Sequence, residues 1–312
     1  MELLGKTNID FIGKRNAAFL FSAVLVLLGL VTVVQIYRGK ANLGVDFVGG
    51  TSIQLKFERP VSLADMREVL SRNGLKDSDL QQFAGGDRVM VRVKRGEVGI
   101  GGMAERIRMV VEKEFSNNRF IVEGSNEVGP AIGKDLQRAA LWAILLSLVG
   151  IILYVAWRFE FVFGVAATAA TFHDVLAVLG VFYLLNKEVT LLVVSALLTI
   201  AGYSLTDTVV VYDRIRENLR GRKREPLMDV MNASINQVLN RTAMTSLTTL
   251  LAALALFLLG GEVLRDFSLA LILGILVGTY SSWFVASPIV FEWRTRGFAK
   301  ARKGLRTKAA AR

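Results

Sequence analysis

The 312-residue sequence is 53% hydrophobic and its mean hydropathy is +0.45, which excludes an ordinary soluble domain. The formal net charge of +11 would suit a nucleic-acid partner. Here, however, the basic residues stand beside apolar segments, so we expect membrane lipid and no nucleic acid among the partners. Cysteine is absent. A domain outside the cytoplasm would therefore have no disulfide and would be stabilised by its own core.

Six apolar segments predict six membrane-spanning helices. Each is long enough, or nearly so, to cross a hydrocarbon core of about 30 Å as a helix. The first segment follows Lys14 and Arg15 and lacks a small-residue cleavage site, which predicts a retained signal anchor. The segments are Ala17–Tyr37, Ala139–Trp157, Phe161–Leu185, Val189–Tyr212, about Thr242–Gly260 and Phe267–Phe291.

The distribution of basic residues predicts the orientation of these helices. Arginine and lysine are concentrated before the first segment, in the loop after the fourth and in the C-terminal tail, whereas the opposite loops hold only Lys187 and Arg265, each beside an acid. Both termini are therefore expected to be cytoplasmic. The predicted parts are a cytoplasmic N-terminus (1–16), helix 1 (17–37), an extracytoplasmic domain (38–138), helices 2–6 (139–291) and a basic cytoplasmic tail (292–312).

The stretch between the first two segments is too long for a loop and predicts a folded domain. Its alternating and amphipathic patterns predict the order βαββαβ, which is typical of an α+β ferredoxin-like domain. The glycine-rich stretch 96–102 lacks the lysine and hydroxyl residue of a phosphate-binding loop, so a flexible turn is expected. The predicted elements are Thr51–Glu58, a helix opened by Ser62, Leu80–Phe83, Arg88–Lys94, Met103–Phe115 and Arg119–Glu123.

Glycine-containing segments mark the entry to this domain and the exit from it. Gly49 and Gly50 lie in GVDFVGGT (44–51), and Gly129 and Pro130 lie in EVGPAIGK (127–134). Two interpretations stay open: hinges that let the domain move, or tight turns packed at the membrane surface.

The single histidine, His173, lies next to Asp174 in the middle of the third segment. Charged groups at this depth are expensive unless they are paired or hydrated, so they often mark an ion or proton path. Small residues share the helix face of Asp174, which predicts that it faces protein rather than lipid. The alternative is a histidine with only a structural hydrogen bond. One histidine with carboxylates is a poor transition-metal site, and no metal is expected.

The fourth segment ends in GYSLTDTVVVYDRIREN (202–218), where Asp207 is the deepest charge. Tyr203 and Thr206 lie close to it, and Asp213 and Arg214 are expected to anchor the cytoplasmic edge. On the fifth segment Arg241 falls at a similar predicted depth, in a polar stripe that also contains Gln237, Thr245 and Thr248. An ion pair between Asp207 and Arg241 is therefore predicted, either as part of ion coupling or as a static contact.

Other classes of protein fit the sequence less well. Asp174 and Asp207 lie on adjacent segments, as in intramembrane aspartyl proteases, but the GxGD context is missing and the predicted depths differ by about 10 Å. No GxxxxGK[ST] motif occurs, which argues against nucleotide-driven transport. No enzymatic activity, catalytic residue or cofactor is expected. A passive assembly scaffold stays open, although buried charges argue against it.

Six motifs together resemble the SecF branch of the SecD/SecF family, which belongs to the RND superfamily. In that family the aspartate of GYS-x-x-D and the arginine of NRT are implicated in ion coupling, and they match Asp207 and Arg241. Thr206 stands where the family more often has Asn, and Val48 where it more often has Thr. The motifs are GVDFVGGT (44–51), EVGP (127–130), FHD (172–174), GYSLTDTVVVYDRIREN (202–218), NRTAMTSLTTLLA (240–252) and LALILGILVGTYSSWFVASP (269–288).

The resemblance implies a multi-pass subunit of the bacterial inner membrane that works with SecD and the SecYEG channel. It would couple a flow of H⁺, or alternatively Na⁺, to late steps in the translocation of an exported preprotein. The expected ion-coupling residues are Asp207, Arg241, Asp174 and His173, with Tyr203, Thr206, Thr245, Asp213 and Arg214 in support. The alternative is half of an RND-type exporter of small molecules, which predicts a larger outer domain with a ligand cleft.

Overall fold

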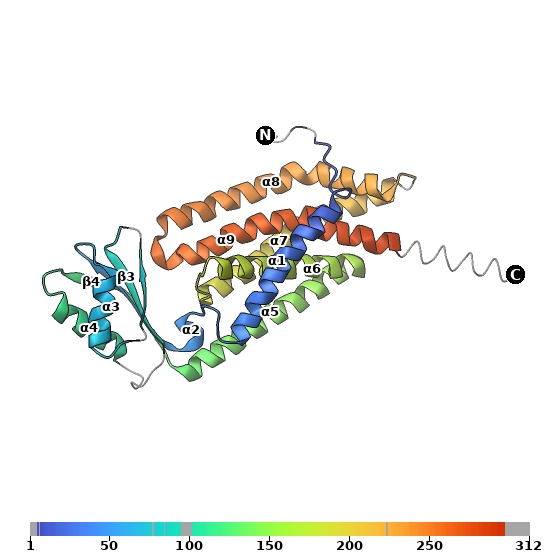
Figure 1. The fold of residues 1–312 in the computed structure, drawn as a ribbon. Coiled ribbons are helices and arrows are strands. Elements are labelled where there is room, and N and C mark those ends of the chain that lie inside the picture. Colours follow the sequence, from blue (N-terminus) through green and yellow to red (C-terminus); the bar gives the residue numbers. More distant parts are fainter. Residues whose placement is uncertain are drawn as a thin grey trace. The chain divides into compact units, whose positions relative to one another are not determined.

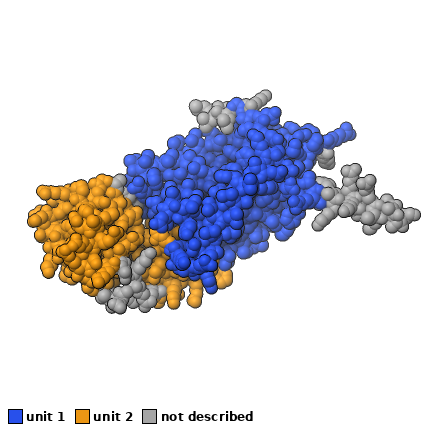
Figure 2. Space-filling view, in the orientation of Figure 1, with its two compact units in different colours: residues 1–41, 143–187, 193–312 blue, residues 42–142, 188–192 orange. Residues whose placement is uncertain are grey.

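The computed structural model describes residues 5, 7–76, 78–83, 85–94, 102–222 and 224–296. These residues are mostly helical and include one small sheet (Figure 1). The chain divides into two compact units, which Figure 2 shows in different colours. The membrane unit comprises residues 1–41, 143–187 and 193–312. The second unit comprises residues 42–142 and 188–192 and is called the outer unit after its predicted location. Most of the predicted basic tail and most of the glycine-rich stretch 96–102 lie outside the described residues.

Within the described chain, six helices are long and apolar enough to cross a membrane, which confirms the predicted multi-pass membrane protein. Most of them extend beyond the apolar segments because helix-compatible polar residues continue them. The helices are α1 (Arg15–Tyr37), α5 (Pro130–Arg158), α6 (Phe161–Leu184), α7 (Leu191–Gly221), α8 (Leu227–Leu259) and α9 (Gly261–Ser281), the last of which continues through the π-helical turn η1 (Ser282–Ala286).

Helices α1 and α6 cross with their backbones almost in contact. A Cβ atom on Gly29 would lie 2.3 Å from the carbonyl oxygen of Leu176, and one on Gly180 would lie 2.9 Å from the backbone nitrogen of Gly29. Only hydrogen fits at these positions, so two glycines set the separation of the helices. The close crossing places the polar residues of α6 inside the membrane unit.

The N-terminal segment is attached to the start of α8 by two asparagines that the sequence analysis did not single out. Asn236 Oδ1 accepts from the backbone N–H of Ile9 at 2.9 Å, and Asn232 Oδ1 accepts from Ile12 at 2.9 Å. The backbone N–H of Gly13 and the side chain of Asn232 hold the pKa of Asp10 below its usual range. The stabilisation from ionised Asp10 is therefore lost as the pH falls through that lowered pKa.

The outer unit contains the predicted order βαββαβ, preceded by the short helix α2. Its sheet is antiparallel throughout, with the strand order β2-β3-β1-β4. Ser62 caps α3 by accepting from the N–H of Ala64 at 3.2 Å, as its position predicts. The ferredoxin-like classification stays a prediction. The elements are α2 (Val45–Val48), β1 (Gly50–Phe57), α3 (Leu63–Arg72), β2 (Ser78–Gln82), β3 (Arg88–Lys94), α4 (Met103–Glu114) and β4 (Phe120–Val128).

Strand alternation gives the sheet one apolar and one polar face. Alternate residues of β1 and β3 form a core with α3 and α4, comprising Ile53, Leu55, Val89, Val91, Met66, Leu70, Ile107 and Val111. The intervening strand positions include two polar side chains that are nevertheless buried, Gln54 and Arg92. A buried arginine requires a partner.

The predicted hinge residues lie inside the outer unit rather than at its limits. Gly49 has φ +79° and forms the whole connection between α2 and β1, which begins at Gly50. Gly129 alone separates β4 from α5, whose first residue is Pro130. These positions are therefore tight connections between regular elements. Movement at them stays a prediction.

Replacing Gly29 with alanine should push α1 and α6 apart. We expect Gly29→Ala to lower the free energy of unfolding by about 1–3 kcal/mol, the usual cost of overpacking. Thermal unfolding of the purified protein in detergent measures the effect. Gly150→Ala on α5 is the matched control, since nothing lies within 4 Å of its added Cβ atom. Equal stability of the two variants would contradict the close crossing.

Candidate functional site

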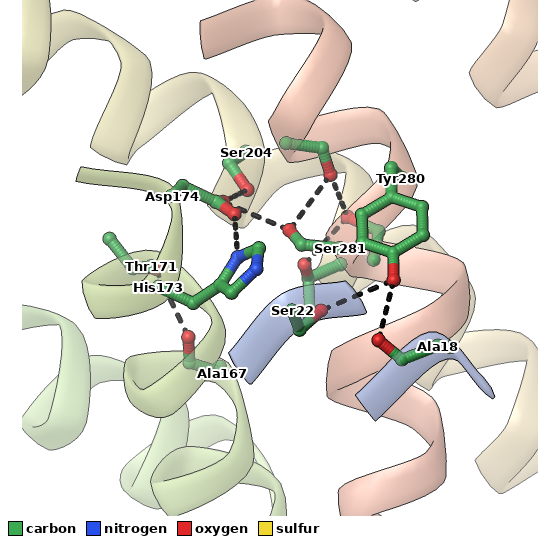
Figure 3. A network of polar contacts seen from close by, with 12 residues as sticks. Ala18, Ser22, Ala167, Thr171, His173, Asp174, Ser204, Tyr280 and Ser281 are labelled. Carbon is green, nitrogen blue, oxygen red and sulfur yellow. Dashed lines mark hydrogen bonds and ion pairs between the residues drawn. The ribbon is translucent and has the colours of Figure 1, made fainter. Parts of the chain in front are cut away.

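Asp174 is fully buried and lies where α6, α7 and α9 meet (Figure 3). Its Oδ2 atom accepts hydrogen bonds from Ser204 Oγ at 2.6 Å and from Ser281 Oγ at 2.9 Å. Its Oδ1 atom lies 3.0 Å from His173 Nδ1. The carboxylate therefore faces protein, as its small-residue helix face predicts, and two other helices supply its partners.

The GxxxG pair of α9 makes these contacts fit. A Cβ atom on Gly278 would lie 2.9 Å from Ser204 Cβ, and one on Gly274 would lie 2.2 Å from Ile200 Cδ1. Both glycines thus face α7 and allow α9 to approach it closely. The motif packs helices within this chain and brings Ser204 and Ser281 to the same carboxylate.

His173 is buried, and its two ring nitrogens differ in their surroundings. Nδ1 contacts Asp174, whereas Nε2 has no hydrogen-bond partner among the described residues. The ring lies beside Tyr280, with ring centroids 6.3 Å apart. The Tyr280 hydroxyl donates to the carbonyl oxygen of Ala18 at 2.9 Å and lies 3.1 Å from Ser22 Oγ on α1. An imidazole with one unused nitrogen can hold a proton or bind a water molecule.

Asp207 forms a second buried carboxylate site, between α7, α8 and α9. Its Oδ1 atom lies 3.2 Å from Thr245 Oγ1, and its Oδ2 atom lies 3.2 Å from Ser246 Oγ. Ser246 Oγ is in turn 2.7 Å from Thr279 Oγ1. Hydroxyl groups, rather than a cation, therefore surround this carboxylate.

A short polar segment of α9 serves both carboxylates. Thr279 reaches the Asp207 site through Ser246, Ser281 donates to Asp174, and Ser282 Oγ lies 2.9 Å from Thr208 Oγ1 on α7. The π-helical turn η1 begins at Ser282, and such turns are frequent at functional sites. Ser204, at the Asp174 site, and Asp207 are three positions apart on α7, which corresponds to about 4.5 Å along the helix axis.

The predicted ion pair between Asp207 and Arg241 is absent. Among the described residues Arg241 has no acidic partner within 4.0 Å, and its side chain is exposed. Thr245, one helical turn further along α8, and the adjacent Ser246 contact Asp207 instead. The polar stripe of Gln237, Arg241, Thr245 and Thr248 is exposed on the surface of the chain.

The other predicted residues occupy separate positions. The hydroxyl of Tyr203 is buried without a hydrogen-bond partner in the described structure, and Thr206 is exposed and donates to its own helix at Gly202. Asp213 lies 3.5 Å from Arg158 of α5. Arg214 contacts Glu217 and Gln237, both at 2.6 Å. Asp213 and Arg214 thus connect α7 to α5 and α8. Their anchoring role at the cytoplasmic edge stays a prediction.

Sequence analysis missed the hydroxyl residues that hold the two carboxylates, namely Ser204, Ser246, Thr279 and Ser281. Each lies within a quoted motif, but serine and threonine are common in membrane helices and often bond only their own backbone. The positions of these residues in the sequence do not indicate which side chains they contact. Among the described residues no group of three or more histidine, cysteine or acidic side chains could hold a metal ion.

Comparison with known proteins identifies the family to which the chain belongs. The model for "Protein export membrane protein SecD/SecF, C-terminal" matches residues 110–296, more than half of the chain. The chain belongs to the SecD/SecF family. A second model, the SecD/SecF GG motif, matches residues 41–61, which include Gly49 and Gly50. The resemblance inferred from the motifs is thereby confirmed.

Individual relatives agree with this assignment. Protein translocase subunit SecF of Thermodesulfovibrio yellowstonii is 54% identical over 293 residues, covering 93% of this chain and 96% of the relative. SecDF of Thermus thermophilus is 42% identical over 93% of this chain, which corresponds to 39% of that protein. The crystal structure of SecDF from that organism, described as a translocon-associated membrane protein, matches with a TM-score of 0.80 at 40% identity. This match covers 93% of this chain and 39% of SecDF.

The hydroxyl contacts of Asp174 can be tested through stability. We expect Ser281→Ala to lower the free energy of unfolding by about 1–3 kcal/mol because a buried carboxylate loses a donor. Ser268→Ala is the matched control, since Ser268 is equally buried on α9 but bonds only the carbonyl oxygens of Leu264 and Arg265. Thermal unfolding compares the two variants. If Ser268→Ala lowered the free energy of unfolding as much as Ser281→Ala, the hydrogen bonds proposed around Asp174 would be contradicted.

Proposed function

We propose that the chain is a SecF-type subunit of the bacterial protein export machinery. Together with a SecD partner it couples a flow of protons, with sodium as the alternative ion, to late steps of preprotein translocation through SecYEG. It lies in the inner membrane with both termini in the cytoplasm. Its family, the SecF relatives and the six apolar helices support this assignment.

The observation that carries ion coupling is the pair of carboxylates buried among hydroxyl groups. A hydroxyl donates to an ionised carboxylate and accepts from a protonated one, so it serves both protonation states. When Asp207 is ionised, Ser246 donates to it and accepts from Thr279. When Asp207 is protonated, Ser246 accepts from it and donates to Thr279, which then donates to the Ile275 carbonyl oxygen, 2.7 Å away.

This arrangement changes the mechanism expected from the sequence. A direct ion pair would favour ionised Asp207 strongly and would have to break at each proton uptake. Reversal of a hydroxyl chain needs only rotation of hydroxyl hydrogens. Arg241 then acts as a nearby positive charge rather than as a bonded partner. Because Thr279 and Ser281 are two residues apart on α9, protonation of Asp207 is conveyed to the surroundings of Asp174 through this segment.

The exposed stripe on α8 supports the SecD partner. Gln237, Arg241 and Thr248 are polar and exposed on a helix that spans the membrane. Such residues are expensive against lipid and are usually covered by protein or water. SecDF of Thermus thermophilus is much longer than the part that this chain matches, as its 39% coverage shows. We therefore infer that SecD covers α8 and completes the polar path.

The alternative, half of an RND-type small-molecule exporter, fits less well. It predicts a larger outer domain with a ligand cleft, whereas the described outer unit contains one four-stranded sheet and its short helices. The SecF relatives also match along nearly their whole length.

Ion coupling is tested with inner-membrane vesicles that contain this chain and its SecD partner. We expect Asp207→Asn to lower the gradient-dependent part of preprotein export roughly tenfold or more, a barrier change of at least about 1.4 kcal/mol. The amide keeps the shape of the side chain but cannot take up and release a proton. Proton and sodium gradients are imposed separately, which identifies the ion.

Asp229→Asn is the matched control, because it makes the same change at an exposed position in the first turn of the neighbouring helix α8. It should leave gradient-dependent export within about twofold of wild type, since surface substitutions are usually mild. Export by Asp207→Asn at the wild-type rate under both gradients would show that this carboxylate does not couple ions.

A further inference from the structure

The end of the loop between α6 and α7, together with the first two residues of α7, belongs structurally to the outer unit. Residues 188–192 group with residues 42–142, although the helices on either side of them group with the membrane unit. From the sequence, Glu188 is expected in a short loop and Val189 is expected to begin the fourth apolar segment. They join α6, which carries Asp174, to α7, which carries Asp207. Three sets of contacts within the outer unit hold them.

The first contact is a buried ion pair. Arg92 lies on the polar face of β3, and its Nη2 atom is 2.7 Å from Glu188 Oε2. Nη2 also donates to Gln81 Oε1 on β2 at 3.0 Å. Arg92 and Glu188 are only 7% and 6% exposed. Arg92 Nη1 also lies 3.9 Å from Asp79 Oδ2. Breaking a buried, hydrogen-bonded ion pair is costly, so the pair of Arg92 and Glu188 holds this segment firmly.

The second contact is a short parallel pairing between backbones. The N–H of Gly44 donates to the Val189 carbonyl oxygen at 2.9 Å, and the N–H of Val189 donates to the Asn42 carbonyl oxygen at 2.8 Å. A Cβ atom on Gly44 would lie 3.0 Å from Thr190 Cγ2, which shows how closely the two segments approach. This pairing joins residues 188–192 to residues 42–44, with which the outer unit begins.

The third contact caps α7 from a distant part of the chain. Asp46 Oδ2 accepts from the N–H of Leu191, the first residue of α7, at 3.0 Å. Asp46 Oδ1 accepts from Asn126 Nδ2 on β4 at 2.9 Å. A carboxylate at a helix N-terminus satisfies a free N–H and is favoured by the helix dipole. One side chain thus connects the sheet to the helix that carries Asp207.

We propose that residues 188–192 are the mechanical link that transmits movement of α6 and α7 to the outer unit. Asp46 and Arg92 are its positioning residues. A rotation or shift of α7 redirects its first N–H groups, which Asp46 couples to β4, while Glu188 pulls on β3. This inference rests on the proposed function for its purpose, since that function requires membrane events to reach the outer unit. In this proposal residues 188–192, rather than the glycine-containing segments 44–51 and 127–134, are the principal route by which helix movement reaches the outer unit.

The test measures energetic coupling between Asp207 and the outer unit by amide hydrogen exchange. The full chain is reconstituted with its SecD partner in lipid nanodiscs, and exchange is followed at residues 42–50 and 189–193. Asp207→Asn should change the exchange rates at residues 42–50 at least about threefold, a shift typical of local opening equilibria. In the Asp46→Ala or Arg92→Gln background the same substitution should change them much less. The difference between backgrounds measures the coupling.

Arg108→Gln is the matched control. Arg108 also pairs with an acid in the outer unit, Glu105, but both side chains are exposed on α4. The effect of Asp207→Asn should persist in this background. An effect of equal size in all backgrounds, or no effect in any, would overturn the link. Normal gradient-dependent export by Asp207→Asn, together with intact exchange coupling, would overturn the proposed function and leave the link standing.

A reversible cross-link separates transmission from general destabilisation. The chain has no cysteine, and a Cβ atom at position 44 would lie 3.3 Å from Thr190 Cα, within reach of a disulfide. Gly44→Cys with Thr190→Cys, oxidised in the Arg92→Gln background, should restore the coupling, and a reductant should remove it again. Failure to oxidise, or oxidation without restored coupling, would contradict the proposal.

Discussion

A carboxylate buried in an apolar bundle needs hydrogen-bond donors, and Asp174 imposes this requirement on the helices around it. Serine is a short side chain, so Ser204 and Ser281 reach Asp174 only if α7 and α9 come very close. Gly274 and Gly278 make that approach sterically feasible. The arrangement of the bundle interior thus follows from one charge and from the residues small enough to let donors reach it.

The same requirement explains why the two carboxylate sites are connected. Ser281 on α9 donates to Asp174, and Thr279, two residues earlier, contacts Ser246, which lies against Asp207. Both sites therefore share one α9 segment through their hydrogen bonds. The π-helical turn η1 follows immediately. A helix with an expanded turn has weaker local backbone constraints than a regular one, which makes this the natural place for the last helix to adjust.

Much of the architecture could be predicted from local patterns. Six spans follow from the length of the apolar runs, and the order βαββαβ follows from alternation and amphipathicity, because both signals lie within a few consecutive residues. Contacts between residues far apart in the sequence could not be predicted as well. The pairing of Asp207 with Arg241 was inferred from similar depth, but Thr245 and Ser246 on the next turn contact the carboxylate instead. Asp46 contacts Leu191, 145 positions later, and Glu188 contacts Arg92, 96 positions earlier. The sequence around these acids contains no pattern that indicates either contact.

The attachment of the N-terminal segment to α8 has a consequence for biogenesis. Phe11 and Ile12 bind Asn232, about 220 residues later in the chain. At a synthesis rate of roughly 5–20 residues per second, the partner emerges about 10–45 s after the segment that it binds. The first helix is therefore inserted with the segment before it still unattached. That segment can be seated only after the start of α8 has been synthesised, which places this contact after the synthesis of α1, α5, α6 and α7.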